Sequence, residues 1–154
     1  MATWITDRTY EDVARVSEIS EKGRSGTWSE EEQAEWAAGM KGALSYMDYN
    51  RIESGIQDIA GVLNASVSVK TDWDVNGYLT ASDASRWLSN IKSIRALCSG
   101  KHSTPLTPDS LDYLYFTVIN QVEEMLLDIE AIAKNHQIYC SEPICGGEPY
   151  YALC

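Results

Sequence analysis

The stretch from Ser45 to Leu63, SYMDYNRIESGIQDIAGVL, has the pattern of an amphipathic helix and decides the fold. Its large apolar residues recur at steps of three and four, a spacing that places them on one helix face. They are Tyr49, Ile52, Ile56, Ile59 and Leu63. Ser45, followed three residues later by Asp48, predicts a capping box, in which a hydroxyl and an acid satisfy free backbone N–H groups. We therefore expect a helix over 45–63 with one buried face.

The start of this helix has a pattern that recurs: a hydroxyl residue, an aspartate three positions later and an arginine three positions after that. The copies begin 36 and 35 residues apart and are Thr9, Asp12 and Arg15; Ser45, Asp48 and Arg51; and Thr80, Asp83 and Arg86. We interpret them as a degenerate internal helix repeat of about 35 residues. The alternative is two ordinary helices with a common cap and a coincidental third copy. Capping and i,i+3 pairing explain each Asp and Arg, which predicts helix-start motifs rather than a ligand site.

The same signals predict the other helices. One is expected over 9–22, a short one after the Ser29 to Glu32 capping box, and one over 80–98, with residues 64–73 as an irregular connector. The longest is expected from the cap at Thr107-Pro108-Asp109 to Asn135. Its apolar stripe predicts packing against the helices over 45–63 and 80–98, with a coiled-coil seam as the alternative. The stripe consists of Leu111, Tyr115, Val118, Val122, Met125, Ile129 and Ile132.

The predicted fold class is therefore all-α: a small bundle of four main helices plus one short helix over 1–138, followed by an extended C-terminal arm over 139–154. Pro143 and Pro149 prevent the arm from forming a continuous helix, and its apolar side chains favour burial. We expect the arm to dock on its own bundle or on a neighbouring subunit. Its candidate contact residues are Tyr139, Ile144, Tyr150, Tyr151 and Leu153.

Tryptophan is the other unusual feature, with five in the chain. Trp87 occupies a stripe position and is expected in the core. Trp4, Trp28 and Trp73 precede helices, where tryptophan either folds a loop back onto the bundle or contacts a partner. These three residues are candidate partner contacts alongside the arm.

Composition narrows the function classes. The chain has 154 residues, with 12 basic against 23 acidic side chains and a net charge of −11. Such a charge repels nucleic acid and anionic membranes, so neither is expected as a partner. There is no apolar run long enough to span a bilayer and no signal-peptide pattern, which predicts a protein made in a cytoplasm. The acids are interpreted as solvated helix faces; the alternative is an acidic inhibitor that imitates nucleic acid.

No pattern of catalytic or cofactor-binding residues is present, so we expect neither an enzyme nor a cofactor. The two histidines, His102 and His136, have no nucleophile at a telling distance, and the adjacent Glu123 and Glu124 are expected on a solvated face. His136, Cys140, Cys145 and Cys154 lack the close Cys-x-x-Cys spacing of structural zinc sites, so no metal is predicted. Cys98 is expected in the core, and the redox state of the three cysteines near the C-terminus stays open.

Several segments resemble small virion proteins of phages and prophages from Gram-positive gut bacteria. They are Lys70 to Trp73 with Thr80 to Ile91, Thr6 to Thr9, and Trp36 to Ala43 running into Tyr49 to Glu53. The resemblance covers about the first hundred residues and implies structural work in the tail or host-contact apparatus, without catalytic residues. On this basis we expect a virion-located protein that forms homo-oligomers and contacts other virion proteins within a particle.

Overall fold

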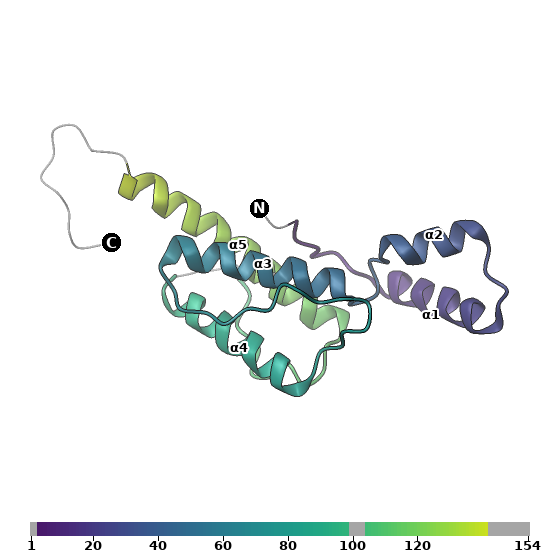
Figure 1. Cartoon of the computed structure of the whole chain (residues 1–154). Coiled ribbons are helices and arrows are strands. Elements are labelled where there is room, and N and C mark those ends of the chain that lie inside the picture. The colour runs from purple at the N-terminus through teal and green to yellow at the C-terminus, as the bar shows by residue number, and fades with distance from the viewer. Residues whose placement is uncertain (1–2, 99–103, 142–154) are drawn as a thin grey trace, which may run out of the picture.

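The computed structural model describes residues 3–98 and 104–141. Within these residues it contains five helices and no strand, which confirms the predicted all-α fold with one short helix. The helices are α1 (Tyr10–Ser25), α2 (Glu30–Ala38), α3 (Tyr46–Leu63), α4 (Ala81–Ala96) and α5 (Phe116–Ser141). Figure 1 shows α3, α4 and α5 packed as a bundle, with the α1–α2 hairpin projecting from one end.

Helix α3 is the centre of the bundle and packs against both α5 and α4. The repeat places equivalent residues in one core, because Ile56 and Ile59 of α3 meet Ile91 and Ile94 of α4. Cys98 is buried at the end of this cluster. From α5 the core receives Val122, Met125, Leu126 and Ile129. The buried part of the α5 stripe therefore packs in the core of its own chain, and its main helix contact is with α3.

The start of α5 differs from the sequence prediction. The helix begins at Phe116 rather than at Thr107, and the segment before it is irregular. Prolines 105 and 108 disfavour helical backbone only at Thr104 and Thr107, which lie before the predicted helix, so they do not account for the irregular backbone of 109–115. Leu111 is nevertheless buried in the core, whereas Tyr115 is 66% exposed. An apolar residue can therefore continue a helical stripe in the sequence while it reaches the core from a loop.

The end of α5 also differs, because the helix continues to Ser141. Tyr139 and Cys140 were predicted in the extended arm, but they belong to the last turn of this helix. The first proline after Asn135 is Pro143, so nothing in the sequence stops the helix earlier. The remaining predicted contacts of the arm, Ile144, Tyr150, Tyr151 and Leu153, lie outside the described residues.

The connector between α3 and α4 is irregular, as expected, and two asparagines hold it. The Asn50 side chain accepts from the Trp73 N–H and donates to the Trp73 carbonyl, both at 2.9 Å. Asn90 accepts from the Ser68 N–H at 3.0 Å and donates to its carbonyl at 2.6 Å. Trp73 is thereby placed in the core, whereas Tyr78 in the same loop is exposed.

The α1–α2 hairpin has little core of its own. Ile19 is buried in α1 and no residue of α2 is buried. The Trp28 ring lies over Gly23 and meets Trp36 edge-on, with ring centroids 6.3 Å apart. An ion pair also joins the two helices, with Lys22 Nζ 2.6 Å from the Glu32 carboxylate. The turn between the helices begins at Gly26, whose backbone is in the left-handed region. The position of the hairpin relative to the bundle therefore depends on residues 39–45, which connect α2 to α3.

Gly42 is the closest backbone contact at this junction, and its replacement by alanine is expected to destabilise the protein. A Cβ at Gly42 would lie 2.2 Å from the Asp12 carbonyl oxygen and 2.6 Å from the Val13 nitrogen, both backbone atoms. Because backbone must move, we expect Gly42→Ala to lower the free energy of unfolding by about 1–3 kcal/mol in urea titrations. Gly61→Ala in α3, which meets no atom within 4 Å, is the matched control and should not destabilise. Equal stability of the two variants would contradict the packing at Gly42.

Candidate functional site

The three repeated motifs form reciprocal caps at the starts of α1, α3 and α4. The backbone N–H groups of Thr9, Ser45 and Thr80 donate to Asp12, Asp48 and Asp83 at 2.8, 3.0 and 3.1 Å. A fourth box, between Ser29 and Glu32, starts α2. Each of these motifs therefore has a local structural role at a helix start.

The arginine of each copy does something that the motif alone does not indicate: it pairs with a glutamate of another helix. Arg51 of α3 pairs with Glu123 of α5 through both oxygens of the carboxylate. Arg86 of α4 pairs with Glu53 of α3, with both contacts at 2.6 Å. Arg15 of α1 pairs with Glu35 of α2 at 2.8 and 3.3 Å. We call these three contacts the Arg–Glu pairs. Through them the repeat arginines connect α3 with α5, α4 with α3, and α1 with α2.

Glu123 is fully buried, which corrects the prediction of a solvated face for Glu123 and Glu124; only Glu124 is exposed. Its carboxylate lies 2.9 Å from Arg8 Nη2, contacts Arg51, and accepts from the Ile5 N–H at 2.7 Å. Adjacent residues of a helix do point in different directions, but Glu123 lies on the buried side. The signal was present, because Glu123 is four residues from Ile119 and three from Leu126, both buried.

Arg8 extends this site into a network. Its side chain is buried and contacts Asp48 at 3.1 Å and the carbonyls of Ile5 and Lys41 at 2.7 and 3.1 Å. It therefore connects the N-terminal segment, the α2–α3 junction and α5. Burial opposes the charge of the neighbouring Arg51, but the hydrogen bonds that it donates to Glu123 and Asp48 outweigh this and raise its pKa. The network thus keeps the half-buried Arg51 charged.

Glu53 is the second fully buried carboxylate. Besides Arg86, it accepts from Trp87 Nε1 at 2.6 Å, Trp73 Nε1 at 3.4 Å and the Lys70 N–H at 2.8 Å. Its hydrogen bonds raise the pKa of Arg86 above the ordinary value. No buried side-chain polar atom in 3–98 or 104–135 lacks a hydrogen-bond partner. A buried ion pair is tolerated only under that condition, so both carboxylates serve the fold.

The tryptophans that were candidate partner contacts divide between the bundle and the hairpin. Trp73 is buried and lies edge-on to Tyr49 at 5.0 Å, so it is a core residue rather than a partner contact. Trp4 is half-buried and its Nε1 donates to Glu130 at 2.8 Å. Trp28 packs on the hairpin. All three hold a loop against the chain's own helices.

A pocket of about 210 Å³ lies where the hairpin joins the bundle, and no sequence pattern predicted it. It is lined mainly by Val13, Leu44, Leu114, Tyr115, Phe116 and Ile119. Exposed tyrosines surround it: the Tyr10 ring meets Phe116 edge-on at 4.8 Å, and Tyr113 stacks on Tyr115 at 6.2 Å. We call this the aromatic pocket. Exposed aromatic residues beside an apolar pocket are typical of surfaces that bind proteins.

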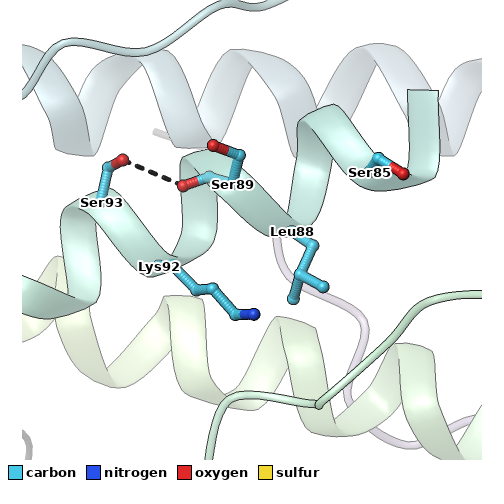
Figure 2. A pocket seen from close by; sticks show the side chains of 5 residues that line it. All are labelled: Ser85, Leu88, Ser89, Lys92 and Ser93. Atoms are coloured by element: carbon cyan, nitrogen blue, oxygen red, sulfur yellow. Dashed lines mark hydrogen bonds between the residues drawn. The ribbon is translucent and has the colours of Figure 1, made fainter. Parts of the chain in front are cut away.

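A second hollow follows one side of α4 and is shown in Figure 2. All of its lining side chains come from this helix: Ser85, Leu88, Ser89, Lys92 and Ser93. The hydroxyls of Ser85 and Ser93 donate to the carbonyls of Ala81 and Ser89 in the preceding turn. The Ser85 and Ser93 hydroxyls are thus used within their own helix, and Lys92 is the only ionisable residue that lines the hollow.

The described part of the chain contains no group of three or more His, Cys, Asp or Glu residues that could hold a metal ion. None of its helices combines the length and the apolar character needed to cross a membrane.

The caps predict a loss of stability in acid. Hydrogen bonds from Thr80 hold the pKa of Asp83 below 3.8, and the Thr9 N–H does the same for Asp12. A carboxylate whose pKa is lowered by folding stabilises the protein above its unfolded pKa, and this stability is lost as the pH falls through the folded pKa. We therefore expect urea midpoints to be constant from pH 7 to about 5 and to fall below about pH 4. Asp83→Asn should reduce the fall of the urea midpoint with pH below about pH 4. An unchanged fall in this variant would exclude Asp83 as one of its sources.

Comparison of the chain with protein-family models, with curated proteins and with solved structures finds no match.

Proposed function

We propose that this chain is a structural protein of a phage particle, a tail-associated or adaptor component that assembles with copies of itself and with other virion proteins. The observation that carries the proposal is the aromatic pocket with its exposed rim of Tyr10, Tyr113 and Tyr115 at the hairpin end of the bundle. The resemblance of the first hundred residues to small virion proteins supports the same role. In this proposal the protein is located in the virion and is not an enzyme.

The distribution of polar contacts supports an assembly role. The buried carboxylates of Glu53 and Glu123 are used by the fold, each with an arginine and further donors. The unusual exposed groups are instead large apolar side chains, and such groups favour contact with another protein surface. The net charge of −11 favours protein partners over nucleic acid or anionic membranes.

The shape of the chain supports the same role. The hairpin and the C-terminal end of α5 lie at opposite ends of the bundle (Figure 1). Two separated ends allow one molecule to contact two neighbours, which is what a repeated component of a particle requires.

Quantitative mass spectrometry of purified particles tests this function. Particles from the phage or induced lysogen that encodes the chain are purified on a density gradient, and copy number is measured against a major capsid protein. We expect many copies per particle and co-sedimentation with the particle peak. A chain that is absent from particles and stays in the soluble fraction would contradict the proposal and favour the acidic inhibitor of a host nucleic-acid enzyme.

A further inference from the structure

We propose that the aromatic pocket binds residues 142–154 of a second copy of this chain, so that copies join head to tail. The inference deepens the proposed function and rests on it, since it names the contact through which copies assemble. The aromatic pocket, which acts as the receptor, lies within the described residues. The segment that would occupy it is known from the sequence.

The receptor offers both a cavity and a rim. The cavity, about 210 Å³, is open to solvent on one side and accepts a large side chain. Most of its lining is apolar and comes from α1, the α2–α3 junction and the start of α5 with the loop before it, and Arg8 also lines it. On the rim, the rings of Tyr113 and Tyr115 are nearly parallel, with ring planes 17° apart, and their exposed fractions are 74% and 66%. Exposed aromatic surfaces bind extended proline-containing segments.

The occupant has matching chemistry. Residues 142–154 read EPICGGEPYYALC, with Pro143 and Pro149 each following a glutamate. Proline favours the polyproline II conformation, in which a segment can bind an aromatic groove at low entropic cost. Tyr150 and Leu153 supply large side chains suited to an apolar pocket, and their burial is favourable. We therefore assign the rim to Pro149 and the cavity to the side chains that follow it.

Geometry favours a second copy over the same chain as the source of this segment. The pocket lies beside Phe116, the first residue of α5, and the segment follows Ser141, the last. A helix of 26 residues is about 39 Å long. Thirteen residues span at most about 45 Å, so binding in the same chain requires an almost fully stretched segment. A neighbouring molecule can supply the segment without this constraint, and the contact then repeats from copy to copy.

Complementation between two variants of the full chain tests the inference. The rim variant carries Tyr113→Ser and Tyr115→Ser, and the segment variant carries Tyr150→Ser and Tyr151→Ser. The control variant carries Val75→Ser and Tyr78→Ser, which replace two exposed side chains of the α3–α4 connector that do not line the pocket. Mass is measured by analytical ultracentrifugation under reducing conditions over a range of concentrations, and folding is checked by circular dichroism.

We expect the wild type and the control to form complexes larger than dimers as concentration rises. Each of the other variants alone should associate at least about tenfold more weakly, because it lacks one half of the contact. Their mixture should form a 1:1 dimer, since the rim variant supplies an intact segment and the segment variant an intact pocket. If the rim variant fails to fold, Tyr10→Ser replaces it, because Tyr10 is exposed and touches Phe116 on the same rim.

A wild type that stays monomeric, a rim variant that associates normally, or a mixture without heterodimer would each overturn the inference. These outcomes are separate from those of the particle assay. Particles that contain the chain without complementation would refute the head-to-tail contact alone. Complementation by a chain that is absent from particles would refute the virion role and leave the contact in place.

Discussion

Replacing Glu123 with alanine is expected to lower the free energy of unfolding by about 3–5 kcal/mol, the range for removing one partner of a buried ion pair. Arg8 and Arg51 would both lose the carboxylate, and the Ile5 N–H would lose its acceptor. Arg8 is itself buried, so its charge would remain in the interior with Asp48 as its carboxylate contact. Urea unfolding followed by circular dichroism measures this loss.

Glu124→Ala is the matched control, because the residue is adjacent on the same helix and exposed. Its change in stability should stay within about 0.5 kcal/mol, as for most surface substitutions. If the two variants were equally stable, the buried position of Glu123 would be wrong. The α3–α5 contact would then have to be held by apolar packing alone.

Replacing Glu53 with alanine is expected to have an effect of similar size, about 3–5 kcal/mol. The substitution removes the acceptor of the Arg86 guanidinium and of the Trp73 and Trp87 indole N–H groups. Buried donors left without a partner add their own desolvation penalty. The loss should be accompanied by a change in tryptophan emission, because both indoles lie in the core and lose a charged neighbour.

Ser54→Ala is the control for Glu53, since Ser54 is the next residue of α3 and is exposed. It should leave both stability and emission nearly unchanged, because alanine is favourable in a helix. A Glu53→Ala protein with wild-type stability would contradict the role assigned to the α3–α4 pair. Unchanged emission would contradict the indole hydrogen bonds.

Local features of the fold could be predicted from the sequence because they depend on residues close in the chain. A cap between Thr80 and Asp83 needs only residues three apart and an apolar stripe after them. The same is true of the buried face of α3, where Ile52, Ile56 and Ile59 follow one another at helical spacing. Where these two signals coincided, as at α3 and α4, the predicted helix starts agree with the structure.

The pairing of the repeat arginines could not be predicted in this way, because their partners are distant in the chain. Arg51 and Glu123 are 72 residues apart, and Arg86 and Glu53 are 33 apart. The apolar residues at helical spacing from Glu123 indicate that it lies on the buried side, but nothing near it in the sequence identifies the two arginines that it contacts. Only the packing of α5 against α3 brings these groups together. The aromatic pocket was missed for the same reason, since its walls come from α1, the α2–α3 junction and α5.

The start of α5 was predicted too early for a different physical reason. Hydrophobic spacing reports which residues are buried, and burial does not require helical backbone. Leu111 is in the core, yet its backbone is irregular. The hydrogen bonds of this segment go to side chains, such as the Gln121 amide that donates to the Leu106 carbonyl at 3.0 Å.

A double-mutant cycle between Arg51 and Glu123 shows whether the repeated motifs join helices of the same chain. Unfolding free energies are measured for wild type, Arg51→Ala, Glu123→Ala and the double variant, with Arg15 and Glu35 as an exposed comparison pair. We expect a coupling energy of about 1–3 kcal/mol for Arg51 with Glu123. The comparison pair should give a smaller value, because water screens it. A coupling energy near zero for Arg51 with Glu123 would contradict this role of the repeated motifs.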